Sequence, residues 1–258
     1  LNLFFIFNTM TTEEYADKLR IALSTVHDGW KPIFKKNKIF LHEALTNILK
    51  ETPLELITPP IPTIFRTFMI NPTDIKVVII GQDPYPKKDD ANGLCFSTNA
   101  NNTPASLKNI FNCLNRLGYE TSSNNLCTWL LQGVLLLNTS LTTEIGSTKK
   151  HSNFWSKFIN NIISDFSLLN KKGKISFLLW GNDAQKLETY IKGKHNIYKW
   201  THPSPMADNH LLEHKKFINC DNFDNLLDID WSTGKEIIIY TDGSGRPDDN
   251  CSSAIYIP

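Results

Sequence analysis

Four short runs of apolar residues recur along the chain, at positions 77–80, 134–137, 177–180 and, more weakly, 197–200. In the first three runs nearly every position is apolar, rather than every second one. Continuous apolarity is typical of strands that are covered on both faces, as in a parallel sheet flanked by helices. The pattern therefore predicts four buried parallel strands.

Between and around these strands, apolar residues recur with the spacing of an amphipathic helix. One such stretch begins at Leu107 and stops before Gly118, and glycine is common just after the end of a helix. A second stretch covers residues 155–166, and a shorter one over residues 187–191 stops before Gly193. The alternation of strands with helices predicts a fold of the α/β class.

The composition does not change the predicted fold, but it excludes several classes of protein. A chain of 258 residues with 41% hydrophobic and 21% charged positions is neither disordered nor collagen-like. Its formal net charge is only +1, so any binding of nucleic acid must come from a local basic face or from backbone donors. The five cysteines form no CxxC pair, which argues against a disulfide framework or a thiolate metal site and indicates reduced thiols inside a cell.

The pattern divides the chain into three parts. The apolar run in residues 1–9 is too short to span a membrane and lacks the features of a signal peptide, so we expect a non-native or disordered extension before Met10. We expect one main domain over residues 10–229, with the acidic stretch 221–230 as a linker. Residues 230–258 would then start a second unit that is truncated in the middle of a strand.

A polar motif follows each predicted strand. The four motifs are GQDPYP at 81–86, NTSLT at 138–142, GNDAQ at 181–185 and THPSPM at 201–206. Parallel strands end at a common edge of their sheet, and ligands bind where the following loops converge. One of these motifs alone could be a structural turn, but four at one edge predict a single site.

These motifs resemble those of the family 1 uracil-DNA glycosylases. In the order of that family stand GQDPYP (81–86), GLCFS (93–97), LLLNTSLT (135–142), LLWGN (178–182) and HPSPM (202–206). The resemblance covers roughly residues 28 to 228. It implies a three-layer α/β/α fold around a central four-stranded parallel sheet. It also implies an enzyme that flips uracil out of DNA and hydrolyses its N-glycosidic bond, releasing free uracil and leaving an abasic site.

The resemblance further implies an enzyme with no cofactor and no metal. Its partner would be uracil-containing DNA, single- or double-stranded, with replication proteins as further partners and no membrane. We expect a monomer that acts inside a cell, in the nucleus or the cytoplasm. That cell could be a host infected by a large DNA virus.

Two residues are expected to carry the chemistry. Positive charge develops on the sugar and negative charge on the base as the bond breaks, so catalysis depends on charges placed in advance at both ends. Asp83 would stabilise the sugar cation and orient the attacking water. His202 would donate a hydrogen bond to uracil O2, a role that a neutral imidazole can fill.

Other residues of the motifs are expected to recognise the flipped base, which must leave the stack to be reached. Gln82, with the backbone beside it, would bind a uracil carbonyl or the water, and Phe96 would stack on the ring. Asn138 would accept from N3–H and donate to O4, a pattern that cytosine lacks. Tyr85 would stand against C5 and exclude the methyl group of thymine.

The remaining expected site residues would hold DNA outside the pocket. Met206 stands where the family usually has a leucine that fills the vacated stack. Phosphate contacts are expected from small hydroxyl residues and backbone N–H groups more than from lysines. The candidates are Ser106, Ser204 and the turn formed by Gly181 and Asn182.

Several positions depart from the family pattern. Pro86 replaces the usual histidine, as in poxvirus members, Asn182 replaces a serine, and Ala207 lacks another hydroxyl. These changes concern DNA affinity more than chemistry. They leave open an alternative function, that of a DNA-polymerase accessory factor on the same scaffold with DNA binding as its main role.

The tail carries a second, shorter resemblance. Residues 236–244 are similar to the first strand of a ribonuclease H domain, in which an aspartate at the position of Asp242 helps to hold Mg²⁺. Such a site needs several carboxylates around two metal ions. We therefore expect no ribonuclease activity from this chain, and a nuclease centred on Asp242 is the third reading.

Overall fold

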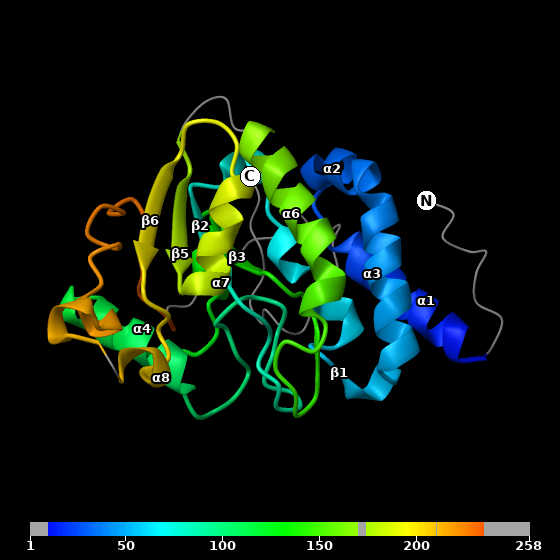
Figure 1. The fold of residues 1–258 in the computed structure, drawn as a ribbon, viewed down its shortest axis with the longest axis horizontal. Helices are drawn as coiled ribbons and strands as arrows, with labels where there is room; N and C mark the ends of the chain where they lie inside the picture. The colour runs from blue at the N-terminus through cyan, green and yellow to red at the C-terminus, as the bar shows by residue number, and fades with distance from the viewer. Residues whose placement is uncertain (1–9, 170–173, 210, 235–258) are drawn as a thin grey trace, which may run out of the picture.

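A computed structural model describes residues 10–169, 174–209 and 211–234 (Figure 1). Its centre is a four-stranded parallel sheet of β2 (Val77–Gly81), β3 (Val134–Asn138), β5 (Ser176–Trp180) and β6 (Asn196–Trp200). The strands lie in the order β3-β2-β5-β6, and each neighbouring pair is parallel. The four strands predicted from apolar runs are confirmed, each within one residue of its predicted start and end.

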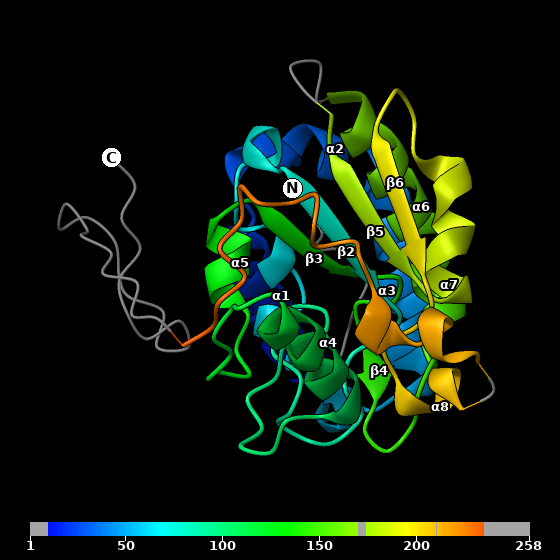
Figure 2. The same cartoon turned by 90° about the vertical axis from the view of Figure 1, so that its left-hand side faces the viewer.

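Helices cover both faces of this sheet (Figures 1 and 2). One face packs against α1 (Met10–Ser24), α2 (Lys31–Lys36), α3 (Lys38–Glu51) and α6 (Ser152–Leu169). The other face packs against α4 (Ala105–Arg116) and α5 (Cys127–Leu131). Alternate residues of β2 enter the two cores, since Val78 and Ile80 belong to the first and Val77 and Ile79 to the second. The fold is therefore the expected three-layer α/β/α arrangement.

Shorter elements join these layers. The predicted helix over residues 187–191 is a 3₁₀ helix, η6 (Lys186–Tyr190), which follows the single-turn helix α7 (Asn182–Gln185). A second sheet, which the apolar pattern does not indicate, has two antiparallel strands, β1 (Ile57–Thr58) and β4 (Thr143–Glu144). The other short helices are η1 (Asp28–Trp30), η2 (Leu54–Leu56), η3 (Ile61–Thr63), η4 (Arg66–Phe68), η5 (Pro72–Asp74), α8 (Pro205–Asp208), η7 (Glu213–Lys215) and η8 (Phe217–Asn219). No helix in the described ranges is long and apolar enough to cross a membrane.

The segment after η8 is packed, so its interpretation as a linker is wrong. Phe223, Ile229 and Trp231 are buried in the same core as α4 and α5. The Trp129 Nε1–H donates to the Trp231 carbonyl at 3.0 Å, and the Thr233 N–H donates to the Glu120 carbonyl at 2.9 Å. The packed body thus continues beyond residue 229, where we expected the domain to end. Residues 1–9 and 235–258, which include the ribonuclease H-like stretch, lie outside the described residues.

Trp231 should therefore be a stability determinant of the main domain. Because its indole is fully buried against Trp129 and Phe223, Trp231→Ala should lower the free energy of unfolding by about 3–5 kcal/mol. Urea unfolding of the full chain measures this. Leu227→Ala is the matched control, since Leu227 is 77% exposed and its loss should change stability by less than about 0.5 kcal/mol. Equal free energies of unfolding of the two variants would show that the main domain ends at residue 229, as the sequence predicts.

Candidate active site

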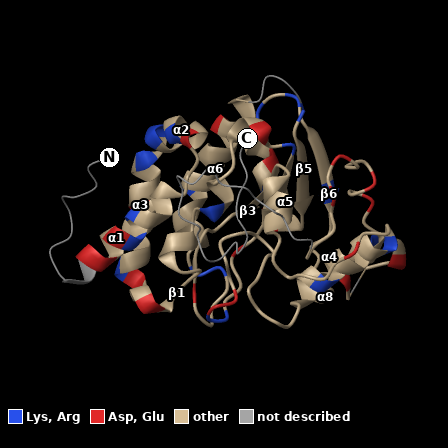
Figure 3. Cartoon of the chain, turned by 180° about the vertical axis from the view of Figure 1, so that it is seen from behind, with Lys and Arg blue, Asp and Glu red and all other residues tan. Residues whose placement is uncertain are grey.

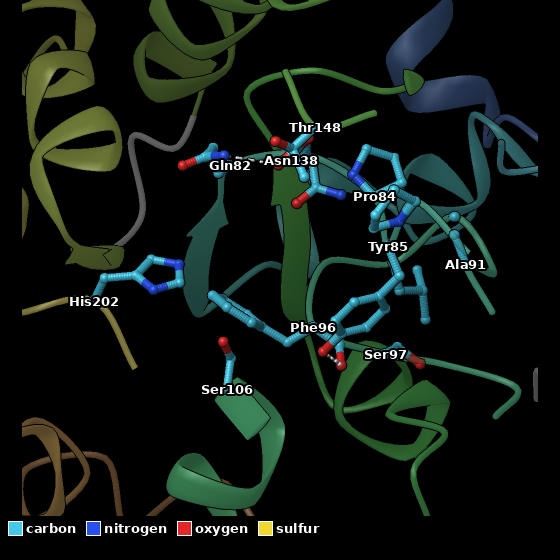
Figure 4. Close-up of a pocket in the computed structure, with 14 residues that line it drawn as sticks. Gln82, Pro84, Tyr85, Ala91, Phe96, Ser97, Ser106, Asn138, Thr148 and His202 are labelled. Carbon is cyan, nitrogen blue, oxygen red and sulfur yellow. Dashed lines mark hydrogen bonds between the residues drawn. The ribbon is translucent and has the colours of Figure 1, made fainter. Parts of the chain in front are cut away.

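A cavity of about 160 Å³ opens at the carboxyl edge of the sheet. Its wall is formed by the loops that follow β2, β4 and β6 and by the last residue of β3, together with the 93–97 segment and the first turn of α4. Figure 4 shows the side chains around it, with the His202 imidazole directed toward the Phe96 ring. Seven of the expected site residues line this cavity, namely Gln82, Asp83, Tyr85, Phe96, Ser106, Asn138 and His202. The other four, Gly181, Asn182, Ser204 and Met206, do not line it.

The Asp83 carboxylate is held by a hydrogen bond on each oxygen. Its Oδ1 accepts from the Gln82 Nε2 amide at 2.9 Å, and its Oδ2 accepts from the Lys149 backbone N–H at 2.6 Å. A carboxylate with both oxygens engaged cannot rotate freely, so its charge stays directed at one place. The backbone of Gln82 is also held in place, because its main-chain carbonyl accepts hydrogen bonds from the Ser140 N–H and the Thr139 hydroxyl. Gln82 therefore orients Asp83 in addition to lining the cavity.

His202 has its proton on the nitrogen that is free to donate. Its Nδ1 lies 3.0 Å from the Ser204 backbone N–H and accepts from it, so the neutral ring carries its proton on Nε2. Burial, aided by the charge of Lys149, lowers the pKa of His202 below its ordinary value, while Asp183 and Asp83 oppose that shift. A neutral imidazole with an Nε2–H donor therefore stands in the cavity.

Phe96 and Tyr85 form one rigid unit of the wall. Phe96 has a φ of +59°, which is unusual for a residue with a side chain and is often found at functional sites. Its ring lies 5.8 Å from Trp180 and 6.0 Å from His202, measured between centroids. The Tyr85 hydroxyl donates to the Phe96 carbonyl at 3.0 Å, and burial raises the pKa of Tyr85. Both rings are thus fixed in orientation.

Asn138 ends β3 directly opposite Gly81 at the end of β2. The residue is 7% exposed, and a Cβ on Gly81 would lie 2.3 Å from the Asn138 Oδ1 and 2.7 Å from the Cys95 Cβ. Glycine is required at position 81 because the Asn138 amide occupies the space of a side chain. The β2–β3 register therefore determines where this amide stands.

Gly81→Ala should consequently disturb the pocket itself. The added methyl group must displace the Asn138 amide, with a packing cost of about 1–3 kcal/mol, and the activity of the site should fall at least about tenfold because a misplaced amide leaves a buried polar group unpaired. Activity and urea unfolding are measured together. Gly118→Ala is the control, since Gly118 has a φ of +88° but nothing within 4 Å of its Cβ position. It should lose stability and keep activity, and a parallel loss of activity there would contradict the argument.

The expected phosphate and wedge residues stand at or near the starts of two helices, and only Ser106 of these three lines the cavity. Ser106 is in the first turn of α4, Ser204 is the N-cap residue of α8, and Met206 is 82% exposed on α8. The Asn109 amide donates to the Pro203 carbonyl at 2.9 Å, so α4 supports the turn that carries His202. Around α1, α3 and α8 basic residues stand next to acidic ones (Figure 3), as the near-zero net charge suggests.

The expected role of Gly181 in phosphate binding needs a correction. Its N–H donates to the Trp200 carbonyl at 3.0 Å and is not free for a phosphate. Its φ is +84°, and a Cβ there would lie 2.8 Å from the His202 Cβ. Gly181 therefore permits the close approach of His202, and Asn182 remains the phosphate candidate of this turn.

His151 is a buried residue that the motifs did not indicate. Its two ring nitrogens lie 2.9 Å from Thr52 Oγ1 and 2.9 Å from Thr142 Oγ1, and the Trp155 indole N–H donates to the same Thr142 oxygen at 2.8 Å. Burial lowers the pKa of His151 to about 4. This network anchors the loop between β4 and α6, from which Lys149 reaches Asp83.

The stability of the protein should therefore depend on pH through His151. The unfolded chain protonates this histidine near its ordinary pKa of 6.5, whereas the folded chain resists protonation down to about 4. The contribution of the neutral His151 to the free energy of unfolding is complete above pH 6.5 and is lost as the pH falls from 6.5 to about 4. Urea unfolding at several pH values should show a steeper decline for the natural chain than for His151→Gln. Identical slopes would contradict the buried neutral imidazole.

Comparisons with known proteins agree in pointing to one family. Residues 68–227 match the model of the uracil DNA glycosylase superfamily. The uracil-DNA glycosylase of Fusobacterium nucleatum is 36% identical over 209 residues, which cover 78% of this chain and 89% of that protein. The uracil-DNA glycosylase of Buchnera aphidicola is 40% identical over 205 residues, covering 76% and 90%. The crystal structure of mimivirus uracil-DNA glycosylase superposes with a TM-score of 0.67 at 28% identity, covering 78% of each chain.

Proposed function

This chain belongs to the uracil-DNA glycosylase superfamily, and we infer from its site how it releases uracil from DNA. It is a hydrolase that acts on the N-glycosidic bond between uracil and deoxyribose. The observation that carries the residue assignments is the placing of Asp83 and His202 around one small cavity that Phe96 and Asn138 also line. Such a cavity can take one base, with an anion for the sugar and a neutral donor for the base.

In the proposed mechanism the bond between uracil N1 and C1′ breaks toward a sugar cation and a uracil anion. The Asp83 carboxylate, held by Gln82 and the Lys149 N–H, stabilises the cation and orients a water molecule toward C1′. The His202 Nε2–H donates to uracil O2 as negative charge collects there. The water oxygen bonds to C1′, and the proton that it loses passes to the Asp83 carboxylate or to solvent. The electron pair of the broken bond leaves with uracil.

Recognition follows from the rest of the wall. Phe96 stacks on the flipped ring, and the Asn138 amide accepts from N3–H and donates to O4. Tyr85, fixed by its bond to the Phe96 carbonyl, meets C5 and leaves no room for a methyl group. Met206 fills the vacated stack, while Ser106, Ser204 and Asn182 hold phosphates.

We propose further that the enzyme acts as a monomer on uracil-containing DNA, single- or double-stranded, with replication proteins as additional partners. Its place of action would be the nucleus or the cytoplasm. An intracellular place is supported by Cys95, Cys113 and Cys220, which are buried thiols outside any disulfide, as reduced thiols are in a cell.

One experiment tests the function against its alternatives. An oligonucleotide with a single uracil is incubated with the full chain in EDTA, and free base and strand breaks are measured separately. Release of free uracil without Mg²⁺ is the expected result. Tight binding with no release would indicate the polymerase accessory factor, and strand cleavage that needs Mg²⁺ would indicate a nuclease.

A further inference from the structure

The loop between β4 and α6 docks on the turn that carries Asp83. The Gly146 N–H donates to the Pro86 carbonyl at 2.8 Å, and the Lys149 N–H donates to Asp83 Oδ2 at 2.6 Å. To aim its N–H at Asp83, Lys149 adopts a φ of +60°. A residue with a side chain rarely takes this conformation, so surrounding contacts must hold it there.

One of those contacts comes from the other side of the pocket. The Lys149 ammonium lies 2.7 Å from Asp183 Oδ2 in α7, which directly follows the Gly181 turn beneath His202. The second Asp183 oxygen binds Lys186, also at 2.7 Å, within the same turn of chain. Hydrogen bonds from both lysines lower the pKa of Asp183. The Lys149–Asp183 pair is therefore a bridge between the loop that holds Asp83 and the turn that supports His202.

We propose that Lys149 is a positioning residue for uracil release, whose ion pair with Asp183 keeps its own backbone N–H on the Asp83 carboxylate. The inference rests on the proposed function and adds a residue to it. Without the bridge, the loop loses its attachment to α7, and the strained Lys149 backbone can relax. The Asp83 carboxylate then loses the donor on Oδ2 and samples orientations that do not face the sugar.

The chain supplies a matched control for this bridge. Lys186 binds the same aspartate at the same distance but joins residues only three apart, so it cannot hold the loop. We therefore compare Lys149→Met, Asp183→Asn and the double variant with Lys186→Met, measuring the single-turnover rate of uracil release at saturating enzyme. The pair is partly exposed, so each bridge variant should lose about two- to fivefold in rate. The double variant should be no slower than either single one, Lys186→Met should be unchanged, and Lys149→Arg should keep most of the rate.

A purely electrostatic role would give a different pattern. Three charged groups act on His202, of which Lys149 lowers its pKa while Asp183 and Asp83 raise it. If only this field mattered, removing Lys149 and removing Asp183 would change the pH dependence of the rate in opposite directions, and the double variant would return toward the natural enzyme. That result, or rates equal to those of Lys186→Met, would overturn the proposal.

Hydrogen exchange of the Lys149 amide gives a measurement that does not depend on activity. Exchange should be at least twofold faster in Asp183→Asn than in the natural chain and in Lys186→Met, because the bond to Asp83 opens more often. Unchanged exchange in a chain that releases uracil would reject the bridge and leave the function intact. A natural chain that releases no uracil would reject the function, while the exchange rates would still decide whether the bridge holds the loop.

Discussion

Asp83→Asn is expected to lower the turnover of a uracil-containing oligonucleotide by about 10²–10⁴-fold while leaving DNA binding nearly unchanged. The substitution keeps the shape of the side chain but removes the negative charge that faces the sugar. That charge is most valuable in the transition state, when C1′ is cationic, so the loss falls on the rate rather than on affinity. In addition, the new amide must turn its NH₂ group toward either Gln82 or Lys149, both of which now donate to the carboxylate.

Single-turnover rates and fluorescence anisotropy on the same oligonucleotide separate the two quantities. Asp89→Asn is the control, because Asp89 lies six residues further on, is exposed, and has a φ of +65° that asparagine tolerates. It should leave both rate and affinity unchanged. Comparable losses of binding and turnover in Asp83→Asn would instead indicate that Asp83 is only a structural residue of its turn.

Asn138→Asp is expected to exchange the base preference of the pocket. Uracil presents N3–H and O4 to this side chain, whereas cytosine presents a bare N3 and an amino group. An ionised carboxylate accepts from the amino group but cannot donate to O4, and a protonated one can also donate to cytosine N3. Each mispaired polar group costs about 1–3 kcal/mol, so uracil release should fall by at least about tenfold and weak cytosine release should appear.

The measurement is base release from three oligonucleotides that differ only in one uracil, cytosine or thymine. Thymine is the internal control, since Tyr85 keeps its hydrogen bond to the Phe96 carbonyl and still blocks the methyl group. Release of thymine by the variant would mean a loosened pocket rather than an altered edge. An undiminished preference for uracil would show that Asn138 does not read the base.

The sequence by itself determined the sheet and the edge at which the site forms. A continuous apolar run is stable when it is covered on both faces, as between two layers of helices. The positions of β2, β3 and β5 therefore follow from the pattern of apolar residues along the chain. Motifs stand at the ends of these strands and of β6, and parallel strands bring their carboxyl ends together. For this reason Asp83, Asn138 and His202 could be expected in one place before any distance was known.

Only the tertiary structure decided which backbone groups serve the site. The donor on Asp83 Oδ2 is the main chain of Lys149, 66 residues away, and a main-chain N–H has no signature in the sequence. Gly181 was expected to bind phosphate, but the strand pairing that places Trp200 beside it consumes its N–H. Trp231 follows a stretch that is acidic and polar in composition, yet a few buried apolar side chains are enough to dock it on α4 and α5. Burial and backbone pairing depend on contacts distant in the chain, and only the packed fold creates them.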